Sequence, residues 1–418
     1  MRKEEIKEGI NLWLLPDDKF KSYYAAVFLH TPLKKETATE NELIPLLLKR
    51  GSKNYPTKKE ISEKLDMLLG ASLNAYVSKR GEEQMIAFSV SGPSDKYSPF
   101  GGCFSEALNL MFDIAFNHKD NISEEYLKGE KIHLSEIIES EKNDKRAYAS
   151  VRCREEMCKG QSYAVPENGY VSEIQKITPD SIEKRIKEVL SSSVIDIIIA
   201  GSFDEMEAIS SVRALTKNLA PRSEDLPGTT AAENKGLALV TEEMKISQGK
   251  LCIGFTCPVY DAKEDEYAAM LLYNAVFGGG ASSKLFLNVR EKLSLAYYAG
   301  SLYNREKGII LVSSGIECKN FEKTKEEIML QHKAMTEGNI SKEELDTAKK
   351  SLVNSYMSVS DSLKSTVSFN LLGIMNKSLC SPYEMVQRIN RVSLEDISKI
   401  APKVEGSLIY FLKGEEQK

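Results

Sequence analysis

The chain has 418 residues, of which 42% are hydrophobic and 28% charged, and its formal net charge is −5. This length and balance are typical of a globular protein with more than one core. The excess of acid offers no basic surface to a nucleic-acid backbone, and no run approaches the roughly twenty apolar residues of a membrane span. We therefore expect neither nucleic acid nor a membrane as a partner.

The N-terminus and the cysteines indicate the compartment. The opening residues MRKEEIKEGINLWLLPDD begin with charges, but their apolar run is shorter than the core of a secretory signal. Seven cysteines are an odd number, and none lies in a Cys-x-x-Cys pair. This pattern is typical of reduced thiols rather than of a disulfide framework or a thiolate metal site. We expect a cytoplasmic protein.

Long segments of the sequence occur twice. The strand-like run SYYAAVFLHTPL (Ser22–Leu33) has a counterpart in GKLCIGFTCPVY (Gly249–Tyr260). Further along, EKLDMLLGASLNAYVSKRGEEQMIAFSVSG pairs with EKLSLAYYAGSLYNREKGIILVSSG, and KITPDSIEKRIKEVLSSSVIDIIIAGSFD pairs with RVSLEDISKIAPKVEGSLIYFLKG. A repeat of this length indicates a duplicated domain.

Each copy reads as a strand, two helices, a hairpin of two strands, several helices and a final strand. Helix starts are marked by the capping-box spacing of Thr57 with Glu60 and of Ser341 with Glu344. Strands grouped apart from helices predict an α+β fold of two homologous domains, each a mixed sheet flanked by helices. We place the domains at 1–219 and 237–418, joined by a linker, 220–236, that is rich in Pro, Gly, Thr and acids.

The stretch FGGGASSKLFLNVREKLSLAYYAG (Phe277–Gly300) is the most distinctive. Its glycine triplet follows a helical pattern rather than a strand, which argues against a phosphate-binding loop. A plain interpretation is that the glycines end one helix with left-handed backbone and that Ser282 or Ser283 caps the next.

The same stretch resembles the C-terminal-domain signature of the insulinase/pitrilysin family of zinc peptidases, the inverzincins. The family pattern is a Gly-Gly-rich turn, then Ser-Ser-Arg-Leu-Phe, Arg-Glu-Lys and Leu-Ala-Tyr. The segments RGSKNYPTKKE and GASLNAYVSKRGEEQMIAFSV resemble the N-terminal domain of that family. This chain departs from the pattern at Lys284 (usually arginine), Ser294 (usually glycine) and Val77 (usually threonine). The resemblance implies two similar domains that close like a clamshell over a peptide, as in mitochondrial processing peptidase.

The resemblance also implies roles for residues of the C-terminal half. Arg290 and Tyr297 would reach the scissile carbonyl and its developing oxyanion, where fixed donors in a water-poor cavity act strongly. The plain alternative makes Arg290 part of a solvated helix face and Tyr297 part of the core, and Tyr298 is the next candidate if the register slips by one. The substrate-contacting positions implied in this stretch are Gly278, Gly279, Gly280 and Ser282.

On the N-terminal hairpin, Asn74 and Ala75 match the family positions that pair with a peptide main chain by strand addition. A plain edge strand is an equally good interpretation of these two residues.

The metal motif of the family is absent. Inverzincins bind zinc through H-x-x-E-H on one helix, but no two of the four histidines lie within a helical turn: His30, His118, His133 and His332. The family positions fall on Asn41–Pro45 or, one residue later, on Glu42–Leu46, and both histidines are replaced in either register. Pro45 would bend or start the helix. Glu136 matches the third ligand in type, yet one carboxylate cannot hold a zinc ion.

His133 and Glu136 are three residues apart, and as a metal site they lack a third ligand; an exposed pair is the plain interpretation.

We hypothesise a zinc-less, peptidase-like subunit that resembles the YmfF/YfmF-type branch of the family. It would bind no metal or other cofactor itself and would pair with a homologue that keeps the zinc motif, supplying Arg290 and Tyr297 to a shared peptide site. The competing hypothesis is a non-catalytic binding or assembly subunit. A third is an autonomous hydrolase with an unrecognised site.

Overall fold

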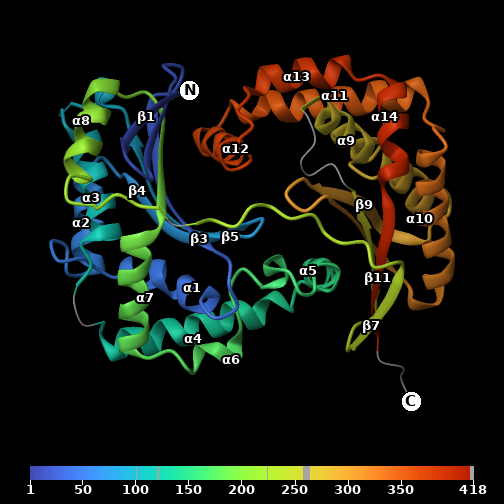
Figure 1. Cartoon of the computed structure of the whole chain (residues 1–418), viewed down its shortest axis with the longest axis horizontal. Helices are drawn as coiled ribbons and strands as arrows, with labels where there is room; N and C mark the ends of the chain where they lie inside the picture. Colours follow the sequence, from blue (N-terminus) through green and yellow to red (C-terminus); the bar gives the residue numbers. More distant parts are fainter. Residues whose placement is uncertain (100, 120–121, 224, 258–263, 415–418) are drawn as a thin grey trace. The chain divides into compact units, whose positions relative to one another are not determined.

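The computed structural model describes residues 1–418 except 100, 120–121, 224, 258–263 and 415–418. It contains two compact units, and both are α+β as predicted (Figure 1). Unit 1 consists of Met1–Glu139, Val165–Gly228 and Ser362–Leu371. Unit 2 consists of Ser140–Ala164, Thr229–Asp361 and Leu372–Lys418.

A six-stranded sheet forms the centre of unit 1. Its order is β1-β2-β6-β3-β5-β4, with β2 and β6 parallel and all other neighbours antiparallel. β4 is therefore an edge strand. The strands are β1 (Arg2–Lys7), β2 (Ile10–Pro16), β3 (Ser22–Pro32), β4 (Ser72–Arg80), β5 (Glu83–Pro93) and β6 (Val194–Gly201).

Helices cover this sheet and bury one continuous apolar core. They are α1 (Ala38–Leu48), α2 (Lys58–Met67), α3 (Cys103–Phe116), α4 (Glu124–Glu141), α6 (Val171–Ile174), α7 (Pro179–Ser192) and α8 (Glu205–Leu215). The capping box predicted at Thr57 and Glu60 is present at the start of α2.

The middle of the unit 1 sheet holds a buried network of charged groups, although the run VIDIIIAG of β6 is otherwise apolar. Asp196 on β6 is 5% exposed and accepts a hydrogen bond of 2.7 Å from Trp13 Nε1. His30 on β3 lies between two carboxylates, with Nε2 at 3.2 Å from Asp196 Oδ2 and Nδ1 at 2.8 Å from Glu83 Oε2. Burial alone would lower the pKa of His30, but these two acids outweigh it and raise the pKa to about 9.

Unit 2 repeats the topology of unit 1. Its sheet has the order β7-β11-β8-β10-β9, which matches β2-β6-β3-β5-β4, and β7 and β11 are the parallel pair, as β2 and β6 are in unit 1. The duplication read from the sequence is thus present in the strand order. The strands are β7 (Ala238–Met244), β8 (Gly249–Thr256), β9 (Ala296–Asn304), β10 (Ile309–Ile316) and β11 (Glu405–Gly414). The last residues of the predicted run Gly249–Tyr260 lie outside the described residues.

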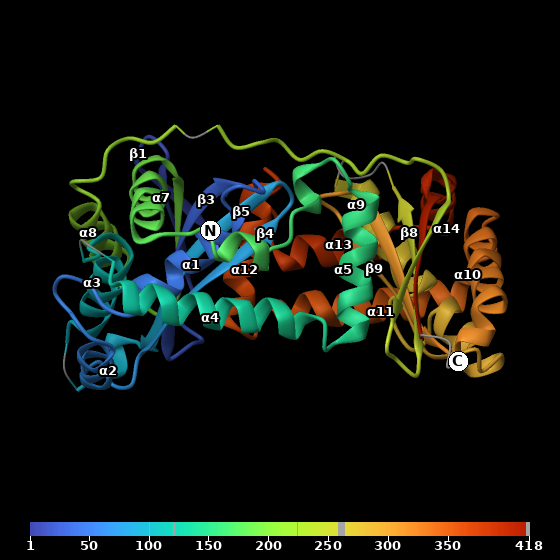
Figure 2. The ribbon, with the colours of Figure 1, turned by 90° about the horizontal axis from the view of Figure 1, so that it is seen from below.

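One helix from the N-terminal half of the sequence belongs to unit 2. α5 (Lys145–Met157) packs on β8, β10 and β11 (Figure 2). Gly254 on β8 permits this contact, because a Cβ there would come within 2.1 Å of the Met157 sulfur. The other helices of unit 2 are α9 (Glu264–Phe277), α10 (Phe321–Thr336), α11 (Lys342–Val359), α13 (Pro382–Arg391) and α14 (Leu394–Ile400). Helix α12 (Leu363–Met375) has most of its residues in unit 1.

The described residues of 220–236 form no helix or strand. Arg222 within this segment is nevertheless buried, and its Nη1 donates to the carbonyl oxygen of Ser193 at 3.1 Å.

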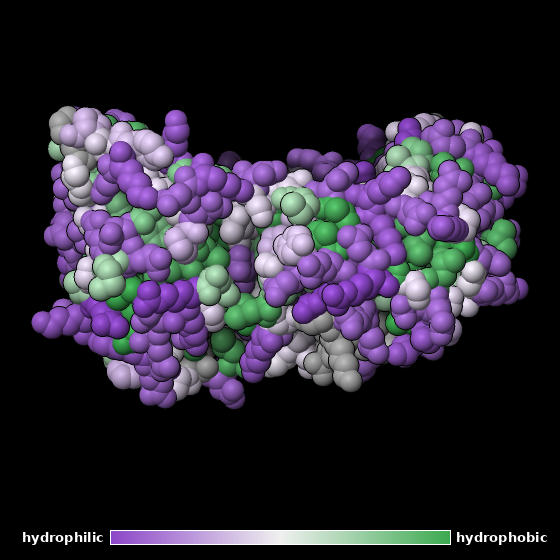
Figure 3. Space-filling view, turned by 90° about the horizontal axis from the view of Figure 1, so that it is seen from above, coloured by the Kyte–Doolittle hydropathy of each residue, from purple (hydrophilic) through white to green (hydrophobic). Residues whose placement is uncertain are grey.

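All seven cysteines are free thiols. In the described part of the chain, no helix combines the length and apolarity needed to cross a bilayer. On the face shown in Figure 3, hydrophilic side chains predominate and apolar ones form separate patches.

Candidate functional site

Arg290 lies on an irregular turn of helix. Residues Phe286–Lys292, labelled η4, form a π-helix, in which Leu293 N donates to Asn288 O at 3.2 Å. Such turns are rare and occur frequently at functional sites. The Arg290 side chain is 43% exposed; its guanidinium lies 4.6 Å from the centre of the Phe286 ring, and its Nε is 3.5 Å from Glu291 Oε1. Its two terminal nitrogens have no hydrogen-bond or ion-pair partner among the described residues, so they remain available as donors.

Tyr297 lies at an irregularity of strand β9. The register between β9 and β10 shifts at this point, so that Tyr298 faces Gly315 and Ala296 faces Ile316, leaving Tyr297 as the extra residue. A bulge of this kind re-aims a side chain. Tyr297 is 62% exposed, whereas the half-buried ring of Tyr298 lies 4.1 Å from the Arg146 guanidinium. The plain alternative, that Tyr297 is a core residue, is wrong.

The glycines before this turn do not adopt a left-handed backbone, and two of them allow close packing instead. None of the three has a positive φ angle. A Cβ on Gly278 would lie 2.5 Å from Ser301 Oγ, and one on Gly279 would lie 2.7 Å from the Cα of Ala275, whereas Gly280 faces open space. The expectation of a left-handed helix end is therefore wrong. Both the exposed Gly280 and the exposed Ser282 remain accessible.

Ser283, not Ser282, organises the turn that follows. Its hydroxyl donates to Gly280 O at 2.6 Å and accepts from Phe286 N at 3.4 Å. Lys284 is buried and donates to Glu344 Oε1 at 2.8 Å. Burial alone would raise the pKa of Glu344, but the hydrogen bonds from Lys284 and Ser341 lower it. The loop is thus tied to the capping box that begins α11, which is present as predicted.

Ser294 occupies the position where the family pattern has glycine, and its backbone explains that preference. Its φ angle is +49°, in the left-handed region that favours glycine. The departure at Ser294 therefore changes the residue but keeps the turn between η4 and β9.

The metal motif of the family can be aligned with helix α1 in two registers. Asn41, in the first register, is fully buried: its Nδ2 donates to Gln84 Oε1 at 2.8 Å and its Oδ1 accepts from Arg185 Nε at 2.8 Å. Glu42 and Leu46, in the second register, are half-buried on one face, which makes this register the one that points outward. Pro45 lies inside α1 rather than at its start, so the expectation of a helix start there is wrong.

Comparisons with known proteins indicate the family of this chain. A protein of Bacillus subtilis strain 168, described as "Probable inactive metalloprotease YmfF", is 30% identical over 415 residues, which cover 98% of this chain and 96% of the relative. Residues 176–352 match the family described as "Peptidase M16 inactive domain". The chain belongs to the M16 peptidase family. The resemblance to the insulinase/pitrilysin peptidases and to their zinc-motif-lacking branch is confirmed.

Further comparisons support the same fold. The "Uncharacterized zinc protease YmxG" of Bacillus subtilis is 22% identical and covers 96% of this chain and 95% of its own length. A crystal structure of a conserved protein from Enterococcus faecalis V583 has a TM-score of 0.91 at 28% identity, covering 100% of this chain and 99% of its own. The structure titled peptidase M16 inactive domain from Pseudomonas fluorescens has a TM-score of 0.82 at 17% identity, with coverage of 100% and 98%.

The residues at the M16 metal positions do not fit a zinc ion. Pro45 and Leu46 have no ligand atom, and Glu136 lines a cavity with Ile177 and Pro179, whereas Leu46 lines a different one. His133 lines the cavity of Leu46 and not that of Glu136. In the described residues, no group of three or more His, Cys, Asp and Glu side chains could hold a metal. We derive no metal chemistry for this chain.

Asn74 and Ala75 lie on the edge strand of unit 1. Asn74 is exposed and faces Ser89 of β5, and half-buried Ala75 faces Phe88. Because β4 has only β5 as a neighbour among the described strands, its other edge can accept a further strand.

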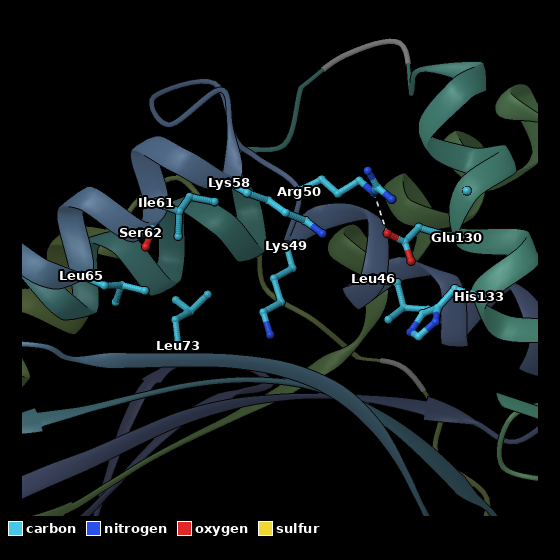
Figure 4. A pocket seen from close by; sticks show the side chains of 11 residues that line it. Leu46, Lys49, Arg50, Lys58, Ile61, Ser62, Leu65, Leu73, Glu130 and His133 are labelled. Carbon is cyan, nitrogen blue, oxygen red and sulfur yellow. Dashed lines mark hydrogen bonds and ion pairs between the residues drawn. The ribbon is translucent and has the colours of Figure 1, made fainter. Parts of the chain in front are cut away.

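The sequence interpretation missed the cavity shown in Figure 4. This α1–α2–α4 pocket, of about 560 Å³, lies between the end of α1, helix α2, strand β4 and the first half of α4. Lys49, Arg50, Lys58, Glu130 and His133 contribute polar groups to its wall. In the sequence, this pocket was indicated only by the charged pair Lys49-Arg50 after the apolar run LIPLLL. The pair did not indicate that α4 would form the opposite wall of a pocket.

Proposed function

We propose that this chain is the non-metal subunit of a heterodimeric M16 zinc peptidase in the cytoplasm. It binds a peptide and supplies Arg290 and Tyr297 to the active site of a homologous subunit that carries the zinc motif. The observation that carries the proposal is that both side chains are exposed and that two separate irregularities, a π-helical turn and a bulge, present them.

The two chains would divide the chemistry between them. The partner would supply zinc, which polarises the carbonyl and activates water. This chain would supply a guanidinium and a phenolic hydroxyl as hydrogen-bond donors to negative charge that develops on the carbonyl oxygen. Asn74 and Ala75 would pair with a peptide main chain at the edge of β4. Gly278, Gly279, Gly280 and Ser282 would form the loop beside the substrate.

Exposed apolar side chains around the same segment support a protein partner. Leu287 and Leu293, at the two sides of Arg290 in sequence, are each 44% exposed, and Leu302 on β9 is 78% exposed. Large apolar side chains that gather on one segment are typical of interaction surfaces.

Mixing the two purified proteins with unstructured peptides tests the proposal. We expect cleavage only in the mixture, and we expect Arg290→Ala and Tyr297→Phe each to lower it without loss of complex formation. If turnover is unchanged in both variants while the complex still forms, the chain is an assembly subunit with no part in catalysis. Cleavage by this chain alone would instead favour the autonomous hydrolase.

A further inference from the structure

The α1–α2–α4 pocket has two positive charges that nothing in the described chain neutralises. Lys49 at the end of α1 and Lys58 at the start of α2 both line it, and both extend toward its interior (Figure 4). Neither ammonium group has an ion-pair partner among the described residues. The third cation of the wall, Arg50, is occupied, because its Nε lies 2.5 Å from Glu130 Oε1 and its guanidinium lies 4.8 Å from the ring centre of Tyr126.

Part of the wall is apolar and belongs to the core. Ile61 is 5% exposed and Leu73 is 7% exposed, and both belong to the core of unit 1. In the second register, Leu46 stands at the position of the second zinc-binding histidine of the M16 motif. The pocket therefore presents two ammonium groups beside an apolar floor. Its volume, about 560 Å³, is within the range of small-ligand sites, which is about 300–1,000 Å³.

A ligand that matches these walls carries an anion next to an apolar group. Lysine binds anions as a point charge with three donors, without the fork geometry that favours a planar partner. Leu73 lies on β4, one residue before Asn74, so a peptide strand added at that edge runs beside the pocket.

We infer that the α1–α2–α4 pocket binds a peptide carboxylate next to an apolar side chain, with Lys49 and Lys58 contacting the carboxylate. The carboxylate is either a C-terminus or an acidic side chain. The choice of a peptide as ligand, and with it of a carboxylate as the anion, rests on the proposed function, whereas the preference for an anion beside an apolar group rests on the pocket alone.

The first test uses a small probe and the isolated chain. N-acetyl-leucine carries a carboxylate beside an apolar side chain, and N-acetyl-leucinamide is its neutral match. Calorimetry or NMR titration should give about fivefold tighter binding for the carboxylate, since two partly exposed ion pairs contribute this much. Raising NaCl from 50 to 500 mM should remove most of the difference. Equal affinities at low salt would overturn the inference.

Substitutions assign the effect to the two lysines. Lys49→Gln and Lys58→Gln should each lower carboxylate affinity about twofold, and the double variant should bind acid and amide equally. Lys59→Gln is the matched control: it removes the same charge from the same helix, but Lys59 does not line the pocket and its side chain is 84% exposed. If Lys59→Gln weakens binding as much as the others, the attraction is general and the site is not the pocket.

Three peptides distinguish the sources of the carboxylate. A neutral, acetylated and amidated six-residue peptide is compared with the same peptide bearing a free C-terminus and with an amidated one bearing an internal glutamate. Tighter binding of either charged peptide supports the inference and names the source, whereas equal binding of all three overturns it. These outcomes are independent of the mixed assay, because an effect of Arg290→Ala on turnover does not involve Lys49 or Lys58.

Discussion

Helix α1 of unit 1 and the segment Phe286–Tyr297 of unit 2 are two signature regions of the same family, and they differ in how far they are exposed. On α1 the motif positions of the first register are buried, and Asn41 joins a network with Gln84 and Arg185, whereas the two histidine positions of the second register are half-buried. On the second segment, Arg290 and Tyr297 are exposed, and both have polar atoms that remain available for hydrogen bonds.

The difference shows which parts of a peptidase fold this chain uses for stability. A helix whose buried residues join the core stabilises the fold, so the substitution of those residues should be measured as unfolding. A segment that keeps an exposed cation and phenol through a π-helix and a bulge gains little stability from them. Its substitution should be measured as activity.

The largest effect is expected at Arg290. In the mixture with a zinc-bearing homologue, Arg290→Ala should lower kcat/KM by about 10²–10³, the loss typical of one donor to an oxyanion. Lys292→Ala, two residues away on the same turn, should change kcat/KM less than about twofold. Steady-state cleavage of a fluorogenic peptide measures both. Equal losses in the two variants would show a general charge effect instead.

Asn41 should give the largest loss of stability. Asn41→Leu keeps the branched shape but removes the hydrogen bonds to buried Arg185 and Gln84, which should lower the free energy of unfolding by about 2–4 kcal/mol. Urea denaturation measures it. Lys49→Gln, on the same helix but at its half-exposed end, should stay within about 0.5 kcal/mol. A mild effect at Asn41 would mean that α1 is not the structural element described.

Stability should fall at alkaline pH because of His30. Its pKa is raised from 6.5 to about 9 in the folded state, so the folded protein holds this proton more tightly than the unfolded chain does. The stabilisation is complete below about pH 6.5 and is lost as pH rises through about 9, a change of about 1–3 kcal/mol. In His30→Gln, the unfolding free energy should lose this part of its pH dependence. A slope identical to that of the wild type would assign the effect to other groups.

Ser294 should give the smallest effect. Glycine accepts the φ angle of +49° without the strain that a side chain imposes, so Ser294→Gly should raise the free energy of unfolding by about 0.5 kcal/mol. Thermal unfolding followed by circular dichroism checks this, with Ser282→Gly, at an exposed position nearby, as the control. A lowered Tm would contradict the assigned strain.

Sequence patterns predicted the elements that depend on local periodicity and capping. The duplicated strands β3 and β8 and the capping boxes at Thr57 and Ser341 are where the residues indicated. The presence of α5 in unit 2 could not be predicted, because it depends on a long-range contact between Met157 and Gly254.

The candidate site shows the same limit. The identities of Arg290 and Tyr297 followed from a motif. The π-helical turn and the bulge that expose them depend on hydrogen bonds that cannot be predicted from the residue types. The lysines of the α1–α2–α4 pocket were likewise visible as charges only. Their convergence depends on how α2 and α4 pack beside β4.

Photo-crosslinking from position 297 tests most directly whether this chain faces the substrate at the partner's metal centre. Tyr297 is replaced by p-benzoylphenylalanine, and a control replaces Tyr383, which is 63% exposed on α13. We predict that position 297 crosslinks to bound peptide when the zinc-bearing homologue is present and that position 383 does not. Absence of any peptide crosslink from position 297 in the assembled complex, or an equal yield from both positions, would contradict the account.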